Sequence, residues 1–203
     1  VSIEPARHNI SPSHEFVVFD GALIRMRWGI VPVGRVNARG RPVMQNLINA
    51  RSETLFEKST FKGVGRAVIP VNGWYEWTGE KRRKTAWRIA PKGGGYLYFA
   101  AITDGWTAPG GLEVPQVAAV TCEPNADVAP IHHRMGVLLE RDALNTWMSD
   151  DLEAVKALMV PWPRGRLDIR EAGDVDWPGP YGRPPVSSDE KYHRRRLLPP
   201  QMK

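Results

Sequence analysis

The chain of 203 residues is long enough for one domain with a core of its own, or for one domain followed by a tail. Its 42% hydrophobic and 25% charged residues are ordinary for a soluble globular protein, and its one cysteine excludes an internal disulfide. No apolar run is long enough to span a membrane, so we expect a cytoplasmic protein with no membrane partner. The net charge of +6 suits a polyanionic partner, but it also occurs in domains that bind no nucleic acid.

The first regular elements expected are two β-strands joined by a tight turn. Residues 15–19 and 22–28 are rich in β-formers and flank Asp20-Gly21, a dipeptide that favours a two-residue primed turn. Apolar and basic residues alternate along 24–28, which predicts a half-buried strand. The following loop, residues 34–42, is rich in Gly and Arg and is either solvated or follows a phosphate backbone.

Short strands dominate the middle of the chain, and helices come late. Strands are predicted at 66–71, 74–77, 87–89, 96–103, 116–121 and 137–139, with a turn at Asn72-Gly73. A short helix at 52–58 would be capped by Ser52, and helical spacing predicts two more helices at 141–148 and 151–159. This pattern predicts an α+β fold of mostly antiparallel strands. We expect one domain over residues 1–175 and a Pro-rich, basic, loosely ordered tail over 176–203.

Two titratable side chains stand among apolar neighbours. Glu76 shares a strand face with Trp74, and lost hydration beside an aromatic ring would raise the pKa of its carboxyl. The alternative is a strand glutamate that faces water. His132 comes just before a predicted strand, where it could transfer protons or hold an oxyanion, unless its ring only makes a structural hydrogen bond.

Asn49 and Arg51 could contact a substrate. Asn49 can hold a carbonyl or an amine, and Arg51 can hold a phosphate; the alternatives are a turn-stabilising amide and a surface salt bridge. Cys122 ends an apolar strand with nothing nearby to lower the pKa of its thiol, so we interpret it as a buried structural residue. No Cys or His pair has zinc-ligand spacing, and no glycine run opens a helix, so we expect neither a metal nor a cofactor.

Four motifs, taken in order, resemble those of the SRAP family, the SOS-response-associated peptidases that sense abasic sites in single-stranded DNA. They are WGIVP at 28–32, NARSET at 49–54, GWYEW at 73–77 and APIHHRM at 129–135. Their order and spacing match across roughly residues 7–150, which is far more specific than any single motif. The resemblance implies a SRAP-like single domain with a barrel-like core, which we expect to be a monomer.

The resemblance also implies a covalent mechanism. Family members remove their own initiator methionine and expose a cysteine. The α-amine of that cysteine condenses with the ring-opened abasic sugar, and its thiol closes the imine to a thiazolidine crosslink. By the same analogy, Glu76 protonates the departing hydroxyl, His132 assists at the sugar oxygen or in strand scission and reversal, and Asn49 orients the amine. Because the chain begins with Val1, we expect the reactive cysteine in a leading segment before it.

Four further residues are predicted DNA contacts. Arg51 would grip a flanking phosphate, and the other three would lie near the site or against a base: Trp28, Trp74 and Arg134. For the two tryptophans, packing in the core is an equal alternative. Two other functions stay open, namely a non-catalytic single-stranded DNA-binding module, and a hydrolase that uses the carboxyl and the imidazole on a small substrate.

Overall fold

The computed structural model describes residues 7–32, 39–40, 46–58, 61–80, 83–108 and 110–173. The predicted tail at 176–203 and most of the Arg-rich loop at 34–42 lie outside these residues. The regular elements, in chain order, are β1 (Glu15–Asp20), β2 (Ala22–Trp28), β3 (Asn49–Arg51), the 3-10 helix η1 (Ser52–Thr54), β4 (Gly65–Val71), β5 (Trp74–Thr78), β6 (Thr85–Pro91), β7 (Leu97–Thr107), β8 (Glu113–Cys122), β9 (Met135–Gly136), β10 (Leu138–Leu139), the 3-10 helix η3 (Arg141–Ala143), α1 (Leu144–Trp147), α2 (Leu152–Ala157) and β11 (Leu167–Glu171).

Five strands close into a ring, in the order β7-β4-β1-β2-β8 and back to β7. All of these pairs are antiparallel except β2–β8, so the predicted α+β fold with a barrel-like, mostly antiparallel core is confirmed. Alternate residues of all five strands fill the interior, and small ones such as Ala67, Ala101 and Ala119 leave room for Phe16 and Met26. β8 also carries β3 and β9, which makes it the strand on which the candidate site is built.

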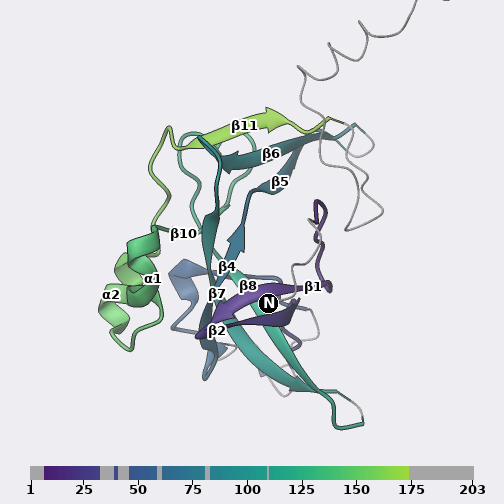
Figure 1. Ribbon diagram of the computed structural model, residues 1–203, viewed down its shortest axis with the longest axis vertical. Helices are drawn as coiled ribbons and strands as arrows, with labels where there is room; N and C mark the ends of the chain where they lie inside the picture. The colour runs from purple at the N-terminus through teal and green to yellow at the C-terminus, as the bar shows by residue number, and fades with distance from the viewer. Residues whose placement is uncertain are drawn as a thin grey trace, which may run out of the picture.

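The outer face of the ring forms a second and larger core. Val68, Ile102 and Val120 point outward and pack in one cluster with residues of the two α-helices, which lie beside the ring in Figure 1. Trp147 at the end of α1 is fully buried and donates its indole N–H to the Ala67 carbonyl oxygen at 2.8 Å, so its polar atom is satisfied. Within the described residues, no helix combines the length and the apolar character needed to cross a membrane.

A separate sheet of three strands, in the order β11-β6-β5, lies above the ring in Figure 1. The chain enters it from β4 through a corner at Asn72-Gly73. A Cβ on Gly73 would lie 2.6 Å from the Ile89 carbonyl oxygen, so only glycine permits this close approach. The sheet face that carries Trp74 and Ile89 packs on the outer core of the ring. Glu76 follows Trp74 by two residues and therefore shares this inward face.

The first hairpin forms as expected, but its register differs from the prediction. Asp20 pairs with Ala22, so the turn is centred on Gly21, with a φ of 71°, and is not a two-residue loop. The strands on either side of Asn72-Gly73 also do not pair with each other, since β4 belongs to the ring and β5 to the small sheet.

The helices are shorter than predicted. The first is one 3-10 turn over Ser52–Thr54, in which Ser52 is an inside residue and Arg51 occupies the capping position without a side-chain cap. The helix predicted at 141–148 forms as η3 followed by α1, and the helix predicted at 151–159 forms as the shorter α2. Asp151 caps α2 by accepting a hydrogen bond from the Ala154 N–H at 3.1 Å. β11 was not predicted, because only two of its residues, Leu167 and Ile169, follow the apolar alternation of a strand.

Candidate active site

Glu76 and His132 meet between the small sheet and the turn that follows β8. The His132 Nδ1 atom lies 3.8 Å from Glu76 Oε1, and the two side chains are 34% and 20% exposed, respectively. The family resemblance implied that these two residues share one site, and they do lie beside each other although they are far apart in the sequence. Two surface hollows, both lined by Leu139 and Trp162, include neither Glu76 nor His132.

Burial raises the pKa of the Glu76 carboxyl, while the positive charge of a protonated His132 and a hydrogen bond from Trp74 act against that rise. Trp74 is half-buried, and its ring meets Phe99 edge-on with centroids 5.4 Å apart. Trp74 therefore supports the carboxyl from the core side, and its predicted DNA contact stays a prediction. A carboxyl that keeps its proton to higher pH than an ordinary glutamic acid is suited to donate that proton.

A turn stabilised by Asn125 fixes the backbone that leads to His132. The Asn125 side-chain oxygen accepts hydrogen bonds from the Asp127 N–H at 3.1 Å and the Val128 N–H at 3.0 Å. The His132 N–H then donates to the Val128 carbonyl oxygen at 3.0 Å, which holds His132 at the exit of the turn. Its ring lies beside the exposed His133 ring, with centroids 4.5 Å apart, and its Nδ1 lies 2.8 Å from the Arg134 carbonyl oxygen.

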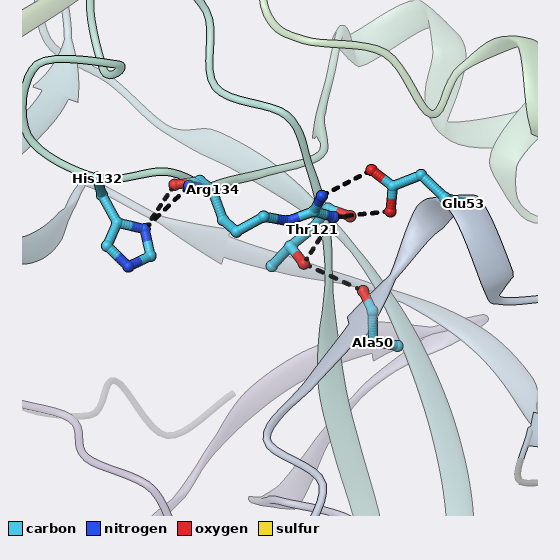
Figure 2. Close-up of polar contacts among 5 residues, drawn as sticks. All are labelled: Ala50, Glu53, Thr121, His132 and Arg134. Carbon is cyan, nitrogen blue, oxygen red and sulfur yellow. Dashed lines mark hydrogen bonds and ion pairs between the residues drawn. The ribbon is translucent and has the colours of Figure 1, made fainter.

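Arg134 joins this turn to two other segments, as Figure 2 shows. Its guanidinium binds both Glu53 carboxylate oxygens, at 2.6 and 2.9 Å, and donates to the Thr121 carbonyl oxygen at 2.6 Å. The hydrogen bonds from Arg134 lower the pKa of the Glu53 carboxyl. Glu53 had no predicted role, and no local signal indicates one, because 81 positions separate it from Arg134. The predicted DNA contact of Arg134 stays a prediction.

β3 presents Asn49 and Arg51 beside this network. It runs parallel to β8, with Asn49 opposite Ala119 and Arg51 opposite Thr121. Both side chains are exposed and, being two residues apart, point to the same face, while Ala50 between them is buried. The two residues are thus placed where a bound strand could reach them, and their predicted roles stay predictions.

Trp28 contacts the residue that precedes β3. Its indole N–H donates to the Ile48 carbonyl oxygen at 3.0 Å, and its ring meets Phe16 edge-on, with centroids 6.2 Å apart. The core packing that the sequence left open is therefore present, and a DNA contact by Trp28 stays untested.

Cys122 takes no part in the site. It is buried, and burial raises the pKa of its thiol to about 11, which confirms that it is a structural residue. Among the described residues, no three His, Cys, Asp or Glu side chains are grouped closely enough to hold a metal ion.

The ring, the small sheet and the pair at their junction define a class of small, single-domain α+β proteins. In this chain a partly shielded carboxyl lies beside an imidazole, and β3 presents two exposed polar residues. The model of the SOS response associated peptidase (SRAP) family matches residues 2–174, and the chain belongs to this family.

Named relatives and solved structures agree. The abasic site processing protein YoqW of Bacillus subtilis (strain 168) is 29% identical over an aligned length of 180 residues, and the alignment covers 83% of this chain and 79% of YoqW. The abasic site processing protein HMCES of Mus musculus is 30% identical over an aligned length of 188 residues. That alignment covers 77% of this chain and 53% of HMCES, so the match spans about half of that relative. A crystal structure of a protein from Bacteroides thetaiotaomicron shares the fold, with a TM-score of 0.69 at 22% identity over 80% of this chain and 75% of the other.

Proposed function

We propose that this protein recognises abasic sites in single-stranded DNA and traps them covalently through an N-terminal cysteine. Membership of the SRAP family and the names of its relatives support the substrate. The observation that carries the mechanism is the contact between a His132 ring nitrogen and the Glu76 carboxyl, 3.8 Å apart, together with the raised pKa of that carboxyl. In the cell, we propose a monomer in the cytoplasm, and size-exclusion chromatography would test the monomeric state.

The proposed reaction joins an aminothiol to an aldehyde and releases one water. The α-amine of the cysteine has an ordinary pKa near 8, so part of it is neutral and nucleophilic at neutral pH. The amine attacks the C1 aldehyde of the ring-opened sugar to give a carbinolamine, and Glu76 protonates its hydroxyl, which leaves as water. The cysteine sulfur then attacks the imine carbon, its proton passes to the nitrogen, and the thiazolidine ring closes.

The remaining residues hold the partners of this reaction. His132 would receive and return protons at the sugar oxygen or in strand scission and reversal. Asn49 would orient the α-amine, and Arg51 would bind a phosphate next to the abasic site. The cysteine would follow an initiator methionine that the protein removes itself. The mechanism therefore requires a mature protein whose first residue is a cysteine that precedes Val1, and the intact mass of the mature chain tests this requirement directly.

Substitution of Glu76 tests the general acid. Glu76→Gln keeps the size of the side chain but removes the proton donor, so crosslinking should slow by about 10²–10⁴-fold. The assay incubates the mature protein, with its native first residue, with a single strand that carries one abasic site, and resolves the crosslink on a denaturing gel.

Glu171→Gln provides a matched control, because Glu171 of β11 and Glu76 of β5 are the partners of Trp87 on the two strands that flank β6. The control should crosslink at the parent rate. Equal rates for Glu76→Gln and the parent would remove Glu76 from the mechanism. DNA binding without any crosslink by the parent would leave the chain as a non-catalytic single-stranded DNA-binding module.

A further inference from the structure

We propose that Arg134 is a positioning residue: its ion pair with Glu53 fixes the backbone beside His132, so that the Arg134 carbonyl takes the Nδ1 proton and leaves Nε2 to exchange protons with the substrate. The inference rests on the proposed function, because it concerns the same site. It assigns a task to Glu53 and to the main chain of Arg134, and it decides which ring nitrogen is reactive.

The first observation is that one guanidinium holds three segments together. Glu53 lies in η1, directly after the strand that carries Asn49 and Arg51, and Thr121 lies near the end of β8. Arg134 binds both carboxylate oxygens of Glu53 and both the carbonyl oxygen and the hydroxyl oxygen of Thr121, at 2.6 and 3.3 Å for Thr121. Thr121 in turn donates its hydroxyl to the Ala50 carbonyl oxygen at 3.3 Å. Movement of the guanidinium would therefore shift β3 and the His132 backbone relative to each other.

The second observation is that this guanidinium is already engaged and shielded. The Arg134 side chain is 15% exposed, whereas that of Glu53 is 46% exposed. Both terminal nitrogens donate to Glu53, in the planar two-point arrangement that arginine forms best with a carboxylate. A phosphate would have to replace the carboxylate to reach these donors. A role inside the protein therefore fits the geometry better than a contact with a DNA strand.

The third observation concerns the imidazole itself. His132 Nδ1 lies 2.8 Å from the Arg134 carbonyl oxygen and 3.2 Å from the Arg134 N–H. The carbonyl can only accept and the N–H can only donate, so the two contacts favour opposite tautomers, and the shorter one favours a proton on Nδ1. In Figure 2 the other ring nitrogen is turned away from Arg134. A neutral imidazole with its proton on Nδ1 has its free lone pair on Nε2.

Charged and titratable groups meet this ring from each neighbouring element. Glu76 approaches Nδ1 from β5 at 3.8 Å, and the His133 ring lies against it with centroids 4.5 Å apart. Arg134 follows on the same loop, with Glu53 of η1 beyond its guanidinium. Of these groups, the Arg134 main chain makes the shortest contact with Nδ1. A shift of this backbone should therefore affect the protonation of Nδ1 more than a shift of any other neighbour.

The test uses the mature protein with Glu53→Gln and, as a second variant, Arg134→Lys, which keeps the charge but cannot bind a carboxylate at two points. The matched control is Glu153→Gln, which breaks the exposed Glu153–Lys156 pair on α2, where N and O are 2.7 Å apart. Nitrogen-15 spectra of the imidazole, assigned by their loss in His132→Phe, report the tautomer without any need for activity. Single-turnover crosslinking and affinity for an intact single strand, at several salt concentrations, complete the set.

We expect the parent and the control to show a protonated Nδ1 and an unprotonated Nε2 in neutral His132, and the two variants to show a mixture of tautomers. Crosslinking by the variants should slow by about 10–10²-fold, the scale expected when a catalytic group is misplaced by about 1 Å. Their affinity for the intact strand and its salt dependence should stay at the parent values, because no phosphate contact is lost.

Two results would overturn the inference. One is a parent spectrum with the proton on Nε2, or a parent-like spectrum in both variants. The other is weaker strand binding with a smaller salt slope and a parent rate at saturating DNA, which would make Arg134 a phosphate contact. If the parent formed no crosslink, the proposed function would fail, and the ring spectra alone would still support or overturn the positioning role.

Discussion

Gly136 in β9 is the position where one added methyl group should do most damage to the site. A Cβ at this position would lie 2.0 Å from Phe99 Cε1 and 2.3 Å from Phe99 Cδ1. Carbon atoms in contact sit about 3.5–4.0 Å apart, so in Gly136→Ala the ring must move by about 1.5–2 Å. The Phe99 ring supports Trp74, whose hydrogen bond acts on Glu76, so the displacement leads directly toward the candidate acid.

The expected cost follows from the packing around this ring. Forcing an extra methyl group into a filled core costs about 1–3 kcal/mol. With an m-value of about 2 kcal/mol/M in urea, a loss of 2 kcal/mol lowers the unfolding midpoint by about 1 M. Crosslinking by Gly136→Ala should also slow, since Trp74 no longer holds the Glu76 carboxyl in place.

The matched control is Gly105→Ala in β7, where an added Cβ would meet no heavy atom within 4 Å. Its free energy of unfolding should stay within about 0.5 kcal/mol of the parent value. Adding Phe99→Leu to Gly136→Ala should restore part of the lost stability by making room for the methyl group. Equal urea midpoints for Gly136→Ala and Gly105→Ala would refute the reasoning.

Four other measurements address charge and titration. Arg51→Ala should reduce the log–log salt slope of single-strand binding by about 0.7, measured by fluorescence anisotropy. Cys122 should resist thiol reagents at about pH 8 in the native protein and react in urea, since its pKa is raised to about 11. The pKa of Glu76 is raised in the folded state, so its carboxyl stabilises the fold less once pH rises above its ordinary pKa of 4.5. Urea titrations should therefore show Glu76→Gln gaining stability relative to the parent as pH rises above about 4.5. The lowered pKa of Glu53 has the opposite sign, so the stability advantage of the parent over Glu53→Gln should shrink as pH falls below about 4.

Local patterns predicted most strands and the part of the site that lies within one strand. Glu76 shares a face with Trp74 because strand residues alternate, and that needs no knowledge of the fold. The register of the first hairpin was wrong by one residue, because Asp-Gly fits more than one turn length and packing of Phe16 and Met26 inside the ring decides between them. No local pattern indicated that His132 lies beside Glu76; only the family resemblance implied that the two residues share a site.

Features that depend on distant pairing could not be predicted. The Glu53–Arg134 pair spans 81 positions, and each residue alone is typical of a solvated charge. The change of sheet between β4 and β5 depends on the space beside Gly73, where the Ile89 carbonyl oxygen comes close. β11 could not be predicted locally because it is a strand through its pairing with β6, which its two apolar residues do not indicate.

The position of β11 sets the order in which the protein can become active during synthesis. The small sheet that carries Glu76 has β5 at one edge and β11 at the other. A two-stranded hairpin alone is marginally stable, so β5 and β6 need this third strand to form a durable sheet. The ribosome makes Leu167–Glu171 more than 90 residues after Glu76 (167 − 76 = 91). A nascent chain that already exposes its N-terminus therefore lacks a firmly placed Glu76. On the proposed mechanism, the N-terminal cysteine would meet its general acid only when the domain is almost complete.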